Sequence, residues 1–167
     1  MQPKPEKESI FTKGKIKDVV VYPLRKFVDE RGYLAELFRH DELAPEFYPT
    51  MAYISFTEPG VQRGPHEHAE QADLFCFIGP SNFKLRLWDN REKSETYRNM
   101  MTLFIGADNP QAVIVPKGVA HGYKNVGSVP GAVINCPNQL YMGQNKKEPI
   151  DEIRHEDDPN TPFRMED

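Results

Sequence analysis

Short apolar runs, separated by turn-forming residues, make up most of this chain. Residues 83–88 show the pattern most clearly, because the apolar residues Phe83, Leu85 and Leu87 alternate with polar ones. A period of two places successive side chains on opposite faces and is typical of a β-strand with one buried face. By such signals we predict strands at residues 16–22, 33–38, 51–57, 74–78, 83–88, 102–105, 112–115, 122–125 and 132–136.

Helical signals are few. The only early candidate is Asp41–Phe47, which Pro45 keeps short, and Asp151–His155 could form one or two last turns. Fifteen prolines and eleven glycines divide the chain into short pieces. Many short strands with frequent turns predict an all-β fold, a sandwich or a small barrel whose interior holds side chains and one ligand. Polar residues that point into this interior are therefore the candidates for function.

Length and charge narrow the possibilities. The 167 residues fit one domain (1–167), with a core over about 16–156 and polar tails at 1–14 and 157–167. The formal net charge is −4 without a basic block, which disfavours binding to nucleic acid. No apolar run approaches the roughly 18 residues that a membrane span requires. No secretory signal is visible at the N-terminus, so we expect a cytoplasmic protein that does not bind a membrane.

Two further features are expected to be structural. Cys76 and Cys136 lie in apolar, strand-like surroundings, which predicts buried free thiols rather than a disulfide. The charged run Glu148–Asp158 is typical of a solvated face.

Two histidine clusters carry the candidate chemistry. The first contains His66 and His68, followed by an acidic residue (Glu70 or Asp73) and later by Gly79; on a strand both rings would share one face. The second reads Pro116-x-Gly118-x-x-His121 with Asn125 four residues on. Together they resemble the two signature motifs of the cupin superfamily. The resemblance implies a jelly-roll barrel (double-stranded β-helix) with short terminal extensions, in which His66, His68 and His121 converge.

More of the chain, from residue 24 to about residue 155, resembles one cupin branch, the dTDP-4-dehydrorhamnose 3,5-epimerase family. The matching segments are Asp29-Glu30-Arg31-Gly32 with Glu36 and Phe38, Arg63-Gly64-x-His66 with Gln71, Asp89-x-Arg91-x-x-Ser94-x-Thr96, and Val115-Pro116-x-Gly118-x-Ala120-His121-Gly122-Tyr123. The resemblance implies a metal-free isomerase of deoxysugar or cell-surface polysaccharide biosynthesis. Its substrate would be a dTDP-4-keto-6-deoxyhexose, which it deprotonates beside the ketone.

The same resemblance assigns roles to residues. His66 would be the base, and His121 would hold the enolate. The substrate-binding residues would be Arg63, Gln71, Arg31, Glu36, Asn135 and Tyr141, of which Arg63 and Arg31 would grip the diphosphate. Arg31 and Glu36 would reach a nucleotide in the neighbouring subunit, which implies a homodimer.

Three departures from the family pattern leave alternatives open. The family's enolate-stabilising lysine falls on Asp73, its reprotonating tyrosine falls on Asn135, and its late aspartate has no counterpart unless a tail residue replaces it.

His68 resembles the His-x-His of dTDP-keto-sugar 3,4-ketoisomerases, where Asp73 could orient a catalytic imidazole. Alternatively, His66, His68, His121 and Asp73 or Glu70 would bind a divalent transition metal, as in cupin oxygenases and sugar-phosphate isomerases. A non-catalytic sugar-nucleotide binder is the third alternative.

Overall fold

The structure, a computed structural model, describes residues 9–166, and these residues form strands and short 3-10 turns without an α-helix. The strands are β1 (Thr12–Lys13), β2 (Val20–Pro23), β3 (Phe27–Asp29), β4 (Gly32–Leu34), β5 (Tyr53–Thr57), β6 (Gln62–Glu67), β7 (Asp73–Gly79), β8 (Asn82–Asp89), β9 (Asn99–Gly106), β10 (Gln111–Val115), β11 (Val119–Asn125), β12 (Gly131–Asn135) and β13 (Ile153–Arg154). The all-β prediction is confirmed. Every predicted strand overlaps an observed one, whereas β1, β3, β6 and β13 were not among the predicted strands.

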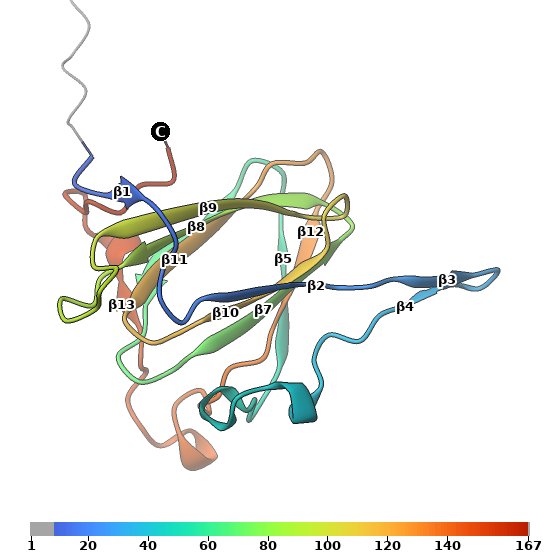
Figure 1. The fold of residues 1–167 in the computed structure, drawn as a ribbon, viewed down its shortest axis with the longest axis horizontal. Coiled ribbons are helices and arrows are strands. Elements are labelled where there is room, and N and C mark those ends of the chain that lie inside the picture. Colours follow the sequence, from blue (N-terminus) through green and yellow to red (C-terminus); the bar gives the residue numbers. More distant parts are fainter. Residues whose placement is uncertain (1–8, 167) are drawn as a thin grey trace, which may run out of the picture.

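Two sheets pack face to face. One has the order β1-β9-β8-β11-β6-β13 and the other the order β2-β10-β7-β12-β5. All pairings within them are antiparallel except that of β1 with β9. Strands that are neighbours in sequence repeatedly lie in opposite sheets, as in a jelly roll. The hairpin of β3 and β4 forms a separate pair that extends away from both sheets (Figure 1).

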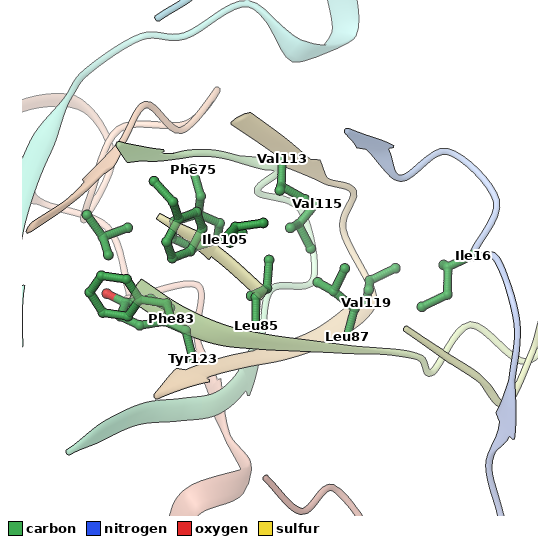
Figure 2. Close-up of a cluster of buried hydrophobic side chains, with 12 residues drawn as sticks. Ile16, Phe75, Phe83, Leu85, Leu87, Ile105, Val113, Val115, Val119 and Tyr123 are labelled. Carbon is green, nitrogen blue, oxygen red and sulfur yellow. The ribbon is translucent and has the colours of Figure 1, made fainter. Parts of the chain in front are cut away.

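The main core lies between the two sheets (Figure 2). Phe83, Leu85 and Leu87 on β8 are completely buried in it, as their alternation predicted. The cluster comprises Ile16, Phe75, Phe77, Phe83, Leu85, Leu87, Ile105, Val113, Val115, Val119, Tyr123 and Val133. Apolar residues of both sheets thus fill part of the barrel interior.

The outer face of the five-stranded sheet is covered by the segment that was expected to contain a helix. Two 3-10 turns, His40–Glu42 and Pro45–Phe47, replace that helix. Pro45 begins the second turn, since it lacks the N–H that a helix interior requires. Cys76 and Cys136 are free and buried beneath this segment, as predicted.

The C-terminal segment is packed rather than a loose polar tail. Phe163 and Met165 are buried against Trp88 and Ala120. The expected helical turns at 151–155 are likewise replaced, because Ile153–Arg154 adds strand β13 to the edge of β6. Within residues 9–166, no helix has the length and apolar character needed to cross a membrane.

Candidate active site

A cavity of about 1400 Å³ opens between the two sheets. Its wall includes Tyr53 of one sheet and His66 of the other, together with many residues of the segment 137–156. Phe75 and Tyr123 belong both to the core cluster and to this wall, so the core closes one side of the cavity.

Three histidines meet at this cavity. His66 on β6 is the direct cross-strand neighbour of His121 on β11, and their ring centres lie 4.6 Å apart. His68 follows β6, and its ring centre lies 5.5 Å from that of His66 and 5.8 Å from that of His121. Gly64 permits this approach, since its φ is +76° and a Cβ there would lie 2.7 Å from the carbonyl oxygen of His121.

Asp73 joins the site residues from the facing sheet. Its Oδ1 accepts hydrogen bonds of 2.8 Å from the side-chain amides of Gln71 and Asn135. Its Oδ2 lies 3.2 Å from Nε2 of His68 and 3.3 Å from Nε2 of His121. This carboxylate, at the position of the family's lysine, is 1% exposed. A buried anion is tolerated there because amides and imidazoles surround it.

Backbone carbonyls fix the orientation of two of the rings. The Nδ1–H of His121 donates to the carbonyl oxygen of Val119 at 2.9 Å, and the Nδ1–H of His68 donates to that of Asp151. A carbonyl only accepts, so in both rings Nδ1 carries a proton. Both Nε2 atoms are then directed at Asp73.

The charges of the site follow from these contacts. Burial alone would lower the pKa of His68, but the adjacent Asp73 carboxylate outweighs it and raises the pKa to about 9. Burial would raise the pKa of Asp73, yet the two imidazoles beside it hold that pKa well below its usual range. Burial, and then the adjacent imidazoles of His121 and His68, lowers the pKa of His66 to about 2. At neutral pH the site therefore contains a neutral His66 beside a cationic His68 and an anionic Asp73.

A clamp from the C-terminal segment holds the loop after β6. The carboxylate of Asp151 accepts hydrogen bonds of 2.8, 2.9 and 2.8 Å from the backbone N–H groups of Ala69, Glu70 and Gln71. The next residue, Glu152, places Oε1 3.8 Å from Nδ1 of His66.

The interpretation of residues 148–158 as a solvated charged face is therefore wrong for Asp151 and Glu152. Their charges are used inside the site, and strand β13 brings them there by pairing with β6. Nothing in the local sequence distinguishes these acids from the exposed ones around them, since their partners lie some 80 residues away.

Of the six residues expected to bind substrate, four lie in or directly behind the cavity wall and two lie away from it. Arg63 and Gln71 line the cavity, and Tyr141 lies half-exposed in its wall. The Arg63 guanidinium donates to Thr57 Oγ1 at 3.0 Å and to the carbonyl oxygen of Phe56 at 2.8 Å. Asn135 lies behind the wall, where it contacts Asp73.

Arg31 and Glu36 are the other two, and neither lines the cavity of its own chain. Arg31 lies in the turn of the β3–β4 hairpin and is paired with Asp29, while Glu36 is paired with Arg39 at 3.6 Å.

His121 does not reach the cavity surface. It is 1% exposed, and it contributes no part of the cavity wall, whereas His66 and His68 do. The expectation that His121 holds the enolate directly is therefore not supported by its place in the structure. Its ring packs edge-on against that of His66 and faces Asp73, which suits a positioning role.

The histidines are also close enough to share a cation. Each can offer one ring nitrogen so that the three atoms lie within 4.8 Å of one another. Imidazole nitrogens are common ligands of divalent transition metals, and Asp73 would add a carboxylate.

Comparisons with known proteins agree with this geometry. The sequence profile of the dTDP-4-dehydrorhamnose 3,5-epimerase family matches residues 13–152. The probable low-salt glycan biosynthesis epimerase Agl13 of Haloferax volcanii is 39% identical over 127 residues, which cover 75% of this chain and 81% of the relative. The spore coat polysaccharide biosynthesis protein SpsL of Bacillus subtilis is 37% identical over 126 residues, which cover 75% and 82%.

A solved structure is also similar over most of its length. The dTDP sugar isomerase of Desulfovibrio desulfuricans superposes with a TM-score of 0.76 at 25% identity, covering 89% of this chain and 91% of that one. The jelly-roll prediction is thereby confirmed. By its sequence and its fold, this chain belongs to the dTDP-4-dehydrorhamnose 3,5-epimerase family.

Proposed function

We propose that this protein epimerises a dTDP-4-keto-6-deoxyhexose in the synthesis of a cell-surface polysaccharide, with His66 as the base. The observation that carries the proposal is the place of His66 in the wall of a large cavity, with the Glu152 carboxylate 3.8 Å from its Nδ1 and the His68 ring centre 5.5 Å from its own. A carbon next to a ketone loses its proton readily, because the electron pair left behind is delocalised onto the ketone oxygen. His66 can take that proton, and the positive charge of His68 stabilises the enolate.

The neighbours of His66 suit this role. Proton uptake converts it to an imidazolium, which the Glu152 carboxylate at 3.8 Å from Nδ1 would stabilise. Glu152 thus replaces in function the late aspartate that the family pattern places further along the chain. His121 and Asp73, buried behind the wall, hold the rings in place.

Cavity size and charge support a nucleotide-linked substrate bound by a homodimer. A volume of about 1400 Å³ exceeds the roughly 300–1,000 Å³ typical of small-ligand sites and accommodates a sugar nucleotide. Its charged wall residues are five acids (Glu70, Glu148, Asp151, Glu152 and Glu156) and four cations (Arg63, Lys146, Arg154 and the protonated His68). A diphosphate needs further cations, and Arg31 on the projecting hairpin of a second subunit would supply one.

Solvent isotope exchange tests the proposal. In D₂O the protein should introduce deuterium beside the ketone of a dTDP-4-keto-6-deoxy sugar and invert that carbon. His66→Asn should reduce exchange by roughly 100-fold or more while preserving the fold, because it removes the base. Binding without exchange would identify a non-catalytic binder and overturn the proposal.

The three-histidine geometry favours a metal centre as the second candidate. Elemental analysis of the untagged protein separates the two. We expect less than a stoichiometric amount of any transition metal, together with exchange activity that survives dialysis against EDTA. A stoichiometric metal that His68→Ala removes, with activity that requires it, would instead support a metal-dependent cupin.

A further inference from the structure

Inversion of a carbon beside a ketone needs two groups on opposite sides of the sugar ring. One removes the proton, and the other delivers a proton to the opposite face. His66 is held by β6 in the six-stranded sheet. The second group should therefore come from the five-stranded sheet, across the cavity.

Tyr53 of β5 lies in that position. Two residues further along the same strand, Ser55 Oγ lies 3.0 Å from Tyr123 Oη of the facing sheet, so this side of β5 points into the barrel. Tyr53 shares that side and lines the same cavity as His66.

The hydrogen bonding of Tyr53 leaves its proton available. The side-chain amide of Asn135 donates to Tyr53 Oη at 2.9 Å, so the phenol oxygen acts as the acceptor in this contact. Across residues 9–166, the phenol has no second hydrogen bond in which it would donate its own proton. The same amide nitrogen of Asn135 is held in place, since it also donates to Asp73 Oδ1 at 2.8 Å.

Two other tyrosines in the cavity wall are less suited. The Tyr123 hydroxyl is already engaged with Ser55 and is buried. Tyr141 comes from the segment after β12 and not from the sheet that faces His66; exposure does not separate the two, since Tyr141 is 51% and Tyr53 is 47% exposed. Burial raises the pKa of Tyr53 to about 12, so at neutral pH this phenol is protonated.

We infer that Tyr53 is the acid that protonates the enolate on the face opposite His66, with Asn135 positioning its hydroxyl; this inference rests on the proposed function. His66 accepts the proton from carbon, and the C–H electron pair moves into the enolate. The Tyr53 O–H bond then breaks as a new C–H bond forms on the other face. The resulting phenolate is stabilised by the Asn135 N–H. Transfer of one proton from the His66 imidazolium to the phenolate through water restores both groups, so no proton is consumed.

The experiment compares exchange with inversion for one substrate in D₂O. Tyr53→Phe should keep deuterium exchange within a few-fold of the unmodified protein, because His66 can return a solvent deuteron to the face it deprotonates. Inverted product should fall by roughly 100-fold or more. Tyr22→Phe is the matched control, since its hydroxyl donates to the Leu37 carbonyl on the outer face of the sheet, and it should leave both rates unchanged.

Three outcomes would overturn the inference. They are normal inversion by Tyr53→Phe, loss of exchange together with inversion in a folded Tyr53→Phe protein, and inversion that Tyr141→Phe alone abolishes. An unmodified protein that neither exchanges nor inverts would instead refute the proposed function, so the two failures can be told apart.

Discussion

The Nδ1–H of His68 donates to the main-chain carbonyl of Asp151, a residue 83 positions further along the chain. The same aspartate uses its carboxylate to hold three N–H groups of the loop that follows His68. One residue thus fixes both the ring and the loop that carries it. The orientation of the cationic histidine is therefore set by the C-terminal segment together with Asp73.

Removal of the Asp151 carboxylate, which holds the loop after His68, should affect catalysis more than stability. We expect Asp151→Ala to lower kcat by roughly 10–100-fold, as loss of an orienting partner commonly does, and the free energy of unfolding by about 1–3 kcal/mol. Steady-state kinetics and urea unfolding measure the two effects. Asp18→Asn, which alters an exposed ion pair with Arg91, is the control and should change neither. An Asp151→Ala protein with normal kcat would exclude the positioning role.

The raised pKa of His68 should make stability fall with rising pH. The folded protein keeps this proton up to pH 9 or so, whereas the unfolded chain releases it near pH 6.5. The stabilisation is thus fully present below about pH 6.5 and is lost as the pH rises through about 9, by a total on the order of 3 kcal/mol.

Asp73→Asn should abolish most of this pH dependence, because it removes the anion that raises the pKa of His68. Urea unfolding between pH 6 and pH 10 measures how steeply the free energy of unfolding changes with pH. This slope is compared between the unmodified protein and the variant, so a loss of stability that is the same at every pH does not affect the test. An unchanged slope in the variant would assign the effect to another group.

Glu152 should assist His66 without being essential. We expect Glu152→Gln to reduce deuterium exchange by about 3–10-fold, since an exposed or half-exposed charge contributes roughly 1 kcal/mol. Glu95→Gln, which alters an exposed pair with Lys17, should have no effect. Exchange rates from NMR provide the measurement. Equal rates for the two variants would show that Glu152 does not act on His66.

The β3–β4 hairpin should hold the proposed dimer together. Val28 is 76% exposed and Leu34 is 66% exposed, although both are large apolar side chains. Val28→Asp should produce a folded monomer of 19.2 kDa in sedimentation velocity and should weaken substrate binding, because it withdraws Arg31 from the neighbouring site. Val126→Asp, at an exposed loop position, is the control and should remain dimeric. A dimeric Val28→Asp protein would place the interface elsewhere.

The C-terminal segment should contribute to global stability. Phe163 is buried, with ring centres 5.7 Å from Trp88 and 5.4 Å from Phe11. Phe163→Ala should lower the free energy of unfolding by about 3 kcal/mol, while Val129→Ala at an exposed position should change it by less than about 0.5 kcal/mol. Thermal or urea unfolding tests this. Equal stability of the two variants would show that the segment is not part of the cooperative fold.

The amino-acid sequence by itself determined most of the strands and the identity of the three histidines. The alternation at 83–88 is a local property, because the strand period puts every second side chain on one face whatever the rest of the chain does. The two histidine clusters are also local, and Gly64 and Gly118 in them have the positive φ values that their turns require.

Only the tertiary structure decided what surrounds those histidines. The position of Asp73 between two imidazoles depends on how the facing sheets pack, and the use of Asp151 and Glu152 depends on where β13 attaches. The placement of Tyr53 across the cavity from His66 depends on the same packing of the two sheets. The burial of Phe163 depends on the packing of the C-terminal segment against Trp88 and Ala120. Such contacts join residues that are distant in sequence, so no periodicity marks them. An acid in a charged run has the same local pattern whether it faces water or a histidine.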